Sequence, residues 1–345
     1  MSPFLSIIIP TYNSEKTIIP LLESIRKSKK VDFGEVELVV VDDCSGDGTV
    51  KKVTFKGSTF KGRGRAICLK KNGGPAHARN VGVKYAKGKV VLFLDSDVVL
   101  YKESLFEAIR SFKNDPDLYA MTGVWDKKQK SQKFFPKFKA LRDWSYWINE
   151  RDPKNYYYLF STRVAAINRA LFLRLRGFDT TYKAALVEDI ELTYRIARRY
   201  AVVFNPKIVV HHEFEDFWVV AKKYFWRSFY WSKIYRSRKK FDPVATTSKE
   251  AITTISAGGV VVFSALTFIS HLSHLSYLSH LLDITLVVAT VIHLFGVRKF
   301  LWFVMREEGI VFALNSFFTG IALYLSILGG AFFSLFGKSR TGRIL

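Results

Sequence analysis

The chain is poor in cysteine: its 345 residues include only Cys44 and Cys68. Two thiols cannot build the disulfide framework of small secreted domains, and they fit a reducing cytosol. We interpret both as ordinary small core residues. The sequence also lacks an N-terminal basic stretch followed by an apolar run, because strand-like residues 5–9 begin almost at once. We therefore expect no signal peptide.

Acidic residues are also scarce, with 30 Asp and Glu against 53 Lys and Arg and a formal net charge of +23. Such an excess is typical of proteins that bind nucleic acid or lie on an anionic membrane. Residues 1–245 read as globular, whereas long apolar runs dominate from about residue 249 onward. These runs favour the membrane, and we expect no nucleic-acid partner. The nucleic-acid alternative rests on charge alone and predicts strongly salt-dependent binding.

The first hundred residues alternate between short apolar strands and helices. The predicted strands span residues 5–9, 37–41, 66–69 and 90–94, and the predicted helices span 14–28 and 75–86. Continuous Val, Ile and Leu strands separated by helices indicate an α/β fold with a parallel sheet covered on both faces.

The middle of the chain is less regular. Residues 101–175 are rich in aromatic and basic side chains. They fit either helices packed on the sheet or a surface that faces a membrane or an acceptor. Farther on, the spacing predicts a helix over 187–200 and late strands at 201–204 and 207–210.

The C-terminal third predicts a membrane region. Residues 216–240 alternate aromatic residues with Lys and Arg, which is typical of an interfacial helix. Three apolar runs follow at about 249–270, 278–297 and 310–336, each long enough to span a bilayer. We expect an α/β domain at 1–215, an interfacial helix and connector at 216–245, and a membrane domain of about three helices at 246–345.

Basic residues predict the orientation of these spans. The loop at 271–277 has no Lys or Arg, whereas the next loop has Arg298 and Lys299. The positive-inside rule then places the N-terminal domain in the cytosol. Three spans would leave Lys338 and Arg340 outside, against the rule. The third run is therefore left open as a span or as a run that breaks or re-enters near 329–330.

Two carboxylates follow the strand at 90–94, in the segment Asp95-Ser96-Asp97. Open α/β sheets place their ligand sites at this carboxyl edge. Two carboxylates there suit Mg²⁺ or Mn²⁺ bridged to a diphosphate, because both ions prefer oxygen ligands. Such a pair is common by chance in loops, so its surroundings decide its meaning.

Two further motifs are expected at the same edge. Pro10-Thr11-Tyr12-Asn13 lies where the first strand meets the first helix, where amides favour anions and an aromatic can pack on a base. Asp42 and Asp43 end the second strand and could accept hydrogen bonds from a base or a ribose. For both motifs plain helix capping is the alternative, by Asn13 or Ser14 in the first and by Ser45 or Asp47 in the second.

A glycine-containing loop precedes the helix predicted at 75–86. Gly73 and Gly74 let the backbone approach a ligand closely. Arg79, one turn inside the helix, could reach phosphate or the loop carboxylates, or it could be a structural ion-pair partner.

These motifs occur in a fixed order: PTYN, VVDDxSxDGT, NxGxxxARNxG and LDSD in the first hundred residues, then RGFD, VEDIELTYR and VVHH. In this order the chain resembles the family-2 glycosyltransferases over about its first 215 residues. The resemblance implies a GT-A fold, with a Rossmann-like mixed sheet, and transfer of a sugar from a nucleotide-diphosphate donor. Here it would be followed by a C-terminal helical transmembrane region.

The resemblance also implies roles for particular residues. Asp95 and Asp97 would hold ribose, metal and pyrophosphate, and Glu188-Asp189 matches the family's acidic pair, whose Asp is the general base. His211 stands where a histidine often completes the metal site, with His212 as the alternative, and this tilts the cofactor from Mg²⁺ toward Mn²⁺. The implied nucleotide-sugar site comprises Pro10, Thr11, Tyr12, Asn13, Asp42, Asp43, Asn72, Gly74, Arg79, Asp95 and Ser96.

The acceptor is expected to be a hydroxyl on a lipid-linked saccharide. A hydroxyl needs a general base, which the acidic pair supplies, whereas a phosphate oxygen is already ionised. The sequence DSDVVLYKES also differs from the DADLQ-like stretch usual in the polyprenyl-phosphate branch, and no QxxRW pattern of processive synthases is present.

We therefore expect an inverting, metal-dependent glycosyltransferase whose catalytic domain lies on the cytosolic side of the cell membrane. A polyprenyl phosphate sugar synthase with the same donor site is the first alternative. A non-catalytic membrane scaffold on the same fold is the second.

Overall fold

The computed structural model describes residues 2–53, 63–150, 159–182, 186–241, 247–273 and 276–337. These residues form two compact units, each described separately below. The sheet unit holds residues 2–132 and 159–214, and the helical unit holds 133–150 and 215–337. Residues 133–150 thus group with the C-terminal helices, a grouping that the expected division at residue 215 does not include.

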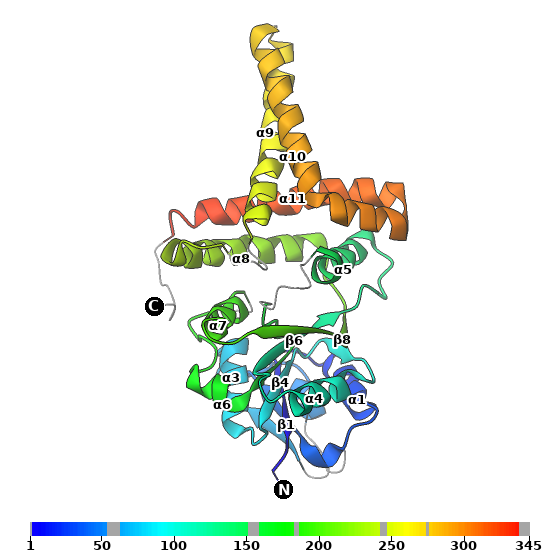
Figure 1. Ribbon diagram of the computed structural model, residues 1–345, viewed down its shortest axis with the longest axis vertical. Coiled ribbons are helices and arrows are strands. Elements are labelled where there is room, and N and C mark those ends of the chain that lie inside the picture. Colours follow the sequence, from blue (N-terminus) through cyan, green and yellow to red (C-terminus); the bar gives the residue numbers. More distant parts are fainter. Residues whose placement is uncertain are drawn as a thin grey trace. The chain divides into compact units, whose positions relative to one another are not determined.

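The sheet unit is built on one eight-stranded mixed sheet in the order β3-β2-β1-β4-β7-β6-β8-β5 (Figure 1). Its strands are β1 (Leu5–Thr11), β2 (Val36–Asp42), β3 (Gly64–Cys68), β4 (Val90–Leu94), β5 (Val98–Leu100), β6 (Ala120–Trp125), β7 (Val164–Asn168) and β8 (Val202–His212). Its helices are α1 (Ile18–Arg26), η1 (Phe33–Glu35), α2 (Thr49–Val53), α3 (Pro75–Tyr85), α4 (Ser104–Asn114), α6 (Arg169–Arg174) and α7 (Glu188–Ile196).

The four strands predicted in the first hundred residues are confirmed, and they pair in parallel. Every residue of β1, β2 and β4 is buried, as expected for strands covered on both faces. The later strands make the sheet mixed, since β7 runs antiparallel to both β4 and β6. This arrangement confirms the fold class.

Three strands were not predicted. Residues 101–175 supply β6 and β7, and β5 follows almost directly after β4. The sequences AMTGVW and VAAIN are short and contain Ala, Gly and Thr, so they lack the Val, Ile and Leu runs that mark the earlier strands. The two late strands predicted at 201–204 and 207–210 are one continuous strand, β8.

An aromatic cluster supports the centre of the sheet. Phe93 of β4 packs its ring against Phe172 of α6 and Phe178, with centroid distances of 5.4 and 5.3 Å. Phe178 belongs to the RGFD segment, where Gly177 adopts a φ of +64°. Asn80 of α3 exchanges two hydrogen bonds with the Phe178 backbone, at 2.8 and 2.9 Å. The cluster therefore ties α3 to the turn that precedes α7.

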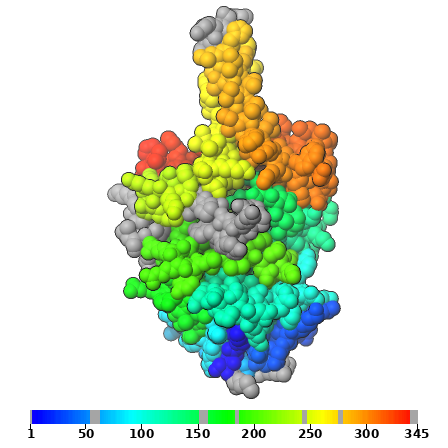
Figure 2. Space-filling view, viewed as in Figure 1, coloured from blue at the N-terminus to red at the C-terminus, as the bar shows by residue number. Residues whose placement is uncertain are grey.

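The helical unit consists of α5 (Phe134–Ser145), η2 (Tyr146–Glu150), α8 (Phe217–Arg238), α9 (Ser248–Leu272), α10 (Ser276–Glu308) and α11 (Ile310–Phe333). Three helical segments, Ser248–Leu272, Ser279–Glu308 and Ile310–Phe333, are long and apolar enough to cross a membrane, which matches the three predicted runs. Helices α9 and α10 pack as a hairpin, a narrow yellow and orange column in Figure 2.

Candidate active site

The Asp95-Ser96-Asp97 segment connects β4 in the middle of the sheet to β5 at its edge. Val98 of β5 lies opposite His212 of β8 in an antiparallel register. This register brings Asp97 and His212 together, with Asp97 Oδ2 3.4 Å from His212 Nε2. The pairing of two strands far apart in sequence thus places an oxygen donor beside a nitrogen donor.

The environment sets the charge of this pair. Partial desolvation raises the pKa of Asp97, whose side chain is 50% exposed, but the contact with His212 and the charge of Arg163 outweigh it and lower the pKa to about 2. Burial and the Arg163 charge lower the pKa of His212. Asp97 is therefore ionised and His212 neutral near pH 7, which are the forms that bind metal ions. The buried Nδ1 of His212 has no hydrogen-bond partner among the described residues.

His211 lies in a different environment from His212. Its Nδ1 lies 3.0 Å from Asp126 Oδ1 and its Nε2 2.6 Å from Glu213 Oε1. The hydrogen bond to Asp126 raises the pKa of His211, and Asp126 also accepts a hydrogen bond from the Tyr101 hydroxyl. Because side chains alternate along a strand, only one of two adjacent histidines can face Asp97. The sequence favoured His211 as the metal ligand; the geometry favours the alternative, His212.

Arg79 of α3 joins the two acidic segments of the site. Its Nη2 lies 2.7 Å from Asp95 Oδ1 and its Nη1 3.0 Å from Glu188 Oε1. Arg79 and Glu188 are each only 2% exposed. Burial lowers the pKa of Arg79, but the charges of Asp95 and Glu188 outweigh it, so the pKa is raised. Arg79 is thus the structural ion-pair partner that the sequence left as an alternative, and it holds α7 beside the end of β4.

Asp189 follows Glu188 in the first turn of α7, where the helix dipole favours a negative charge. Its Oδ1 accepts a hydrogen bond of 2.8 Å from the Ile190 amide, and its charge also acts on Arg79. The orientation of α7 is fixed by Arg195, which donates to the carbonyls of Leu175 and Gly177. The helix that carries Glu188 and Asp189 is therefore held in place by the hydrogen bonds of Arg195.

The structure gives Asp42 and Asp43 organising roles in their loops. Asp42 accepts hydrogen bonds from Thr11 Oγ1 and from the amide of Ser45, at 3.1 and 2.9 Å. Asp43 accepts from the amides of Gly73 and Gly74, at 2.9 and 2.7 Å. Both carboxylates are buried, and they tie the end of β2 to the first strand and to the start of α3. Their expected contact with a nucleoside stays a prediction.

The PTYN segment divides between core and surface. Pro10 and Thr11 are buried in β1, whereas Tyr12 is 54% exposed. Asn13, with a φ of +50°, receives a hydrogen bond from the Gly46 amide and donates its own amide to Ser45 Oγ. Tyr12 and Asn13 are thus the exposed side chains of this segment, and Tyr12 is its exposed aromatic ring.

Two other loop positions complete the expected donor site. Ser96 shares a hydrogen bond of 2.8 Å with Ser14, which links the Asp95–Asp97 segment to the loop after β1. Asn72, in the loop between β3 and α3, is exposed. Asp47, named as an alternative cap, accepts from the amides of Thr49 and Glu15.

Arg163 is a candidate that sequence reasoning missed. Its guanidinium carbon lies 4.4 Å from the ring centroid of Trp125 and 5.3 Å from that of Phe214. Its charge acts on both Asp97 and His212, and its buried Nε has no hydrogen-bond partner among the described residues. It precedes β7 in a segment without any motif, so only the pairing of β6, β7 and β8 reveals it.

The described ranges contain no group of three or more His, Cys, Asp or Glu side chains gathered closely enough to hold a metal ion. Asp97 and His212 nevertheless supply a carboxylate oxygen and an unprotonated imidazole nitrogen that lie 3.4 Å apart. This donor set fits Mn²⁺ better than Mg²⁺, because imidazole suits transition metals and Mg²⁺ prefers oxygen.

Comparisons with known proteins identify the domain that contains these residues. The family model "Glycosyl transferase family 2" matches residues 6–175. The poly(ribitol-phosphate) beta-N-acetylglucosaminyltransferase TarS of Staphylococcus aureus is 42% identical over 131 residues, which are 34% of this chain and 21% of TarS. The minor teichoic acid biosynthesis protein GgaB of Bacillus subtilis is 36% identical over 121 residues, 34% of this chain and 13% of GgaB.

The matched segment is thus about a fifth of TarS and less of GgaB. Among solved structures, this chain resembles the mannosyltransferase PcManGT from Pyrobaculum calidifontis, solved in complex with GDP-Man and Mn²⁺. The alignment covers 98% of this chain and 89% of the PcManGT chain. Its TM-score of 0.60 at 18% identity shows a shared fold. Residues 6–175 therefore form a family 2 glycosyltransferase domain on a GT-A-like mixed sheet.

Proposed function

We propose that the chain is an inverting, metal-dependent glycosyltransferase that moves a sugar from a nucleotide-diphosphate donor to a hydroxyl on a lipid-linked saccharide. The observation that carries the proposal is the Arg79 bridge, which brings Asp95 and Glu188 of two distant acidic motifs together. The reaction would take place at the cytosolic membrane face.

Asp189 is the general base of this proposal. Inversion requires a base on the side of the sugar opposite the leaving diphosphate. Asp189 would accept the proton of the acceptor hydroxyl while that oxygen bonds to the anomeric carbon and the bond to the diphosphate breaks. Its place at the start of α7 and the nearby charge of Arg79 suit a carboxylate in this role. A positioned base contributes about 10²- to 10⁴-fold to the rate.

Asp97 and His212 would hold Mn²⁺, with Asp95 on the donor side. The bound ion would neutralise the negative charge that develops on the leaving diphosphate. Arg163 would add a fixed positive charge at the same place, since it already acts on both Asp97 and His212. Tyr12 would pack on the base, because it is the exposed aromatic ring of the loop after β1.

The relatives bear on the donor and the acceptor. TarS is named as an N-acetylglucosaminyltransferase acting on poly(ribitol-phosphate), and GgaB as a teichoic acid biosynthesis protein. A cell-envelope polymer or its lipid-linked precursor is therefore the acceptor class we favour. The three apolar helices support a membrane-bound acceptor, because they would keep the enzyme at the surface where such a lipid is found.

Transfer assays with the full chain in detergent test the proposal. Labelled UDP-N-acetylglucosamine and other nucleotide sugars would be offered with Mn²⁺ and two acceptors, a lipid-linked saccharide and a polyprenyl phosphate. Asp189→Asn should lose transfer about 10²- to 10⁴-fold with unchanged melting temperature. The matched control Asp117→Asn alters an exposed carboxylate and should keep full activity. Full activity of Asp189→Asn would refute the proposed base, and label on polyprenyl phosphate alone would refute the hydroxyl acceptor.

A further inference from the structure

Within the helical unit, α11 does not run along the hairpin of α9 and α10 but across its base (Figure 1). The contacts of α11 lie near the start of α9 and the end of α10. Tyr324 donates to Glu250 Oε2 at 3.4 Å, and Ile321 and Tyr324 share an apolar cluster with Ala257 and Val297. The middle of α11 is therefore level with the first turns of α9.

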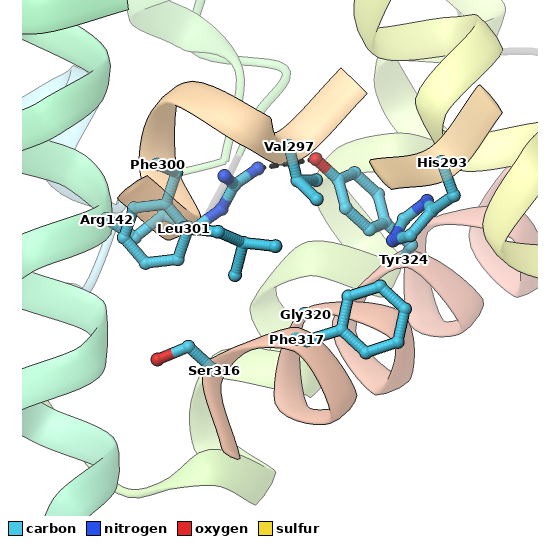
Figure 3. Close-up of a pocket in the computed structure, with 9 residues that line it drawn as sticks. All are labelled: Arg142, His293, Val297, Phe300, Leu301, Ser316, Phe317, Gly320 and Tyr324. Carbon is cyan, nitrogen blue, oxygen red and sulfur yellow. Dashed lines mark hydrogen bonds between the residues drawn. The ribbon is translucent and has the colours of Figure 1, made fainter. Parts of the chain in front are cut away.

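Two charged side chains, Arg142 and Glu250, contact this middle part through Tyr324. Arg142 of α5 donates from Nη2 to the Tyr324 hydroxyl at 2.5 Å, beside a small pocket (Figure 3). The pocket is also lined by His293, Ser316 and Phe317. If α11 crossed a bilayer, its midpoint and this guanidinium would lie near the hydrocarbon centre. A charged arginine at that depth is costly to remove from water.

Helix α8 lies against the C-terminal half of α11. The two backbones approach so closely that a Cβ on Gly330 would lie 2.0 Å from the Phe225 carbonyl oxygen. Ser228 donates to the Ile327 carbonyl at 2.8 Å, and Arg236 donates to the Ser334 carbonyl at 2.6 Å. Six of the 22 residues of α8 are Lys or Arg. A helix with this charge belongs at a membrane surface, and its neighbour α11 must lie at a similar depth.

The opposite side of α11 is an uncovered apolar face. It is formed by side chains between 39% and 69% exposed. These are Val311, Leu314, Phe318, Leu325 and Phe332, at spacings of three, four, seven and seven residues. Such spacing keeps them on one side of the helix along nearly its whole length. We call these five residues the α11 apolar face.

We propose that only α9 and α10 cross the bilayer, and that α11 lies in the membrane plane with its apolar face in the boundary between headgroups and acyl chains. Beyond Ala257, which packs on α11, helix α9 continues for 15 residues, ~22 Å of helix, so the hairpin extends through most of a hydrocarbon core of ~30 Å. The basic residues of α8 would then face anionic headgroups.

This topology agrees with the positive-inside rule. Both ends of α11 lie on the side of the hairpin base, where Arg298 and Lys299 also lie. The chain after α11, whose sequence includes Lys338 and Arg340, would then begin on that side. The conflict that three spans create does not arise with two.

Depth measurements in vesicles test this proposal. In a Cys44→Ser, Cys68→Ser background, single cysteines at Val311, Phe318 and Phe332 would carry a thiol-reactive fluorophore. The protein would be reconstituted into vesicles of phosphatidylcholine and phosphatidylglycerol with nitroxide quenchers on the headgroup or deep in the acyl chain. All three labels should be quenched more by the headgroup nitroxide, at the same depth.

Matched controls at Val262 and Val288, both exposed and near the middle of the hairpin helices, should be quenched more by the deep nitroxide. A label at Phe318 that is deep while those at Val311 and Phe332 are shallow would show a spanning helix and overturn the proposal. Labels on α11 that no lipid quencher reaches would overturn it as well.

Discussion

Arg79 of α3 and Glu188 of α7 form an ion pair of 3.0 Å between side chains that are each 2% exposed. The other arm of Arg79 binds Asp95 at 2.7 Å. A buried arginine shared by two carboxylates compensates charges that would otherwise be costly to desolvate. It also fixes the distance between the two acidic motifs on which the proposed chemistry depends.

The ion pair predicts strong energetic coupling. Arg79→Met and Glu188→Gln should each destabilise the protein by about 3–5 kcal/mol, because each leaves a buried charge with one partner fewer. The double variant should lose clearly less than the sum of the two. Thermal or urea unfolding of the four proteins in detergent gives the coupling energy. Additive losses would contradict a direct interaction.

Substitutions of the two histidines should differ in their effect on metal binding. His212→Ala should weaken Mn²⁺ binding at least ~10-fold, because it removes the imidazole beside Asp97. His211→Asn is the matched control and should keep the affinity, since His211 is held by Asp126 and Glu213. Isothermal titration with Mn²⁺ and a nucleoside diphosphate measures both. A greater loss in His211→Asn than in His212→Ala would reverse the assignment.

We expect the substitution Asp43→Asn to destabilise the fold and not only to weaken ligand binding. Asp43→Asn leaves one oxygen to serve two glycine amides and turns an N–H₂ group toward one of them. The melting temperature should fall by an amount that corresponds to about 1–3 kcal/mol. An unchanged melting temperature together with weaker nucleotide binding would instead support direct contact with the donor.

The lowered pKa of Asp47 should make the stability of the protein depend on pH in the acidic range. The hydrogen bond from the Thr49 side chain lowers the pKa of Asp47 below its usual 3.8. A carboxylate whose pKa is lowered by folding stabilises the protein above the unfolded pKa and loses this effect as the pH falls through the folded pKa. The melting temperatures of the wild type and Asp47→Asn should therefore differ at pH 6 and converge toward pH 3. A constant difference would contradict this.

The sequence predicts the first half of the fold because local signals there agree. Buried runs such as 90–94 and a helix start at Pro75 leave little choice. The strands β6 and β7 escape prediction because their short sequences carry no periodic signal and form only through pairing with β4 and β8.

The candidate site is predictable as a set of motifs but not as a geometry. Choosing between His211 and His212 requires the register of β8 against β5, and this register is set by contacts distant in sequence. The stacking of Arg163 on Trp125 likewise depends on long-range pairing. Hydropathy identifies α11 as apolar, yet its packing on α8 and Arg142 is visible only in three dimensions.

The most direct test of the account is the release of nucleoside diphosphate from a nucleotide sugar by the purified full chain with acceptor-containing lipid. We predict release with Mn²⁺, loss of release when EDTA removes the metal, and at least ~100-fold slower release by Asp97→Ala under the same conditions. Release that persists at the full rate both in EDTA and in Asp97→Ala would contradict a metal-dependent transferase built on Asp97 and His212.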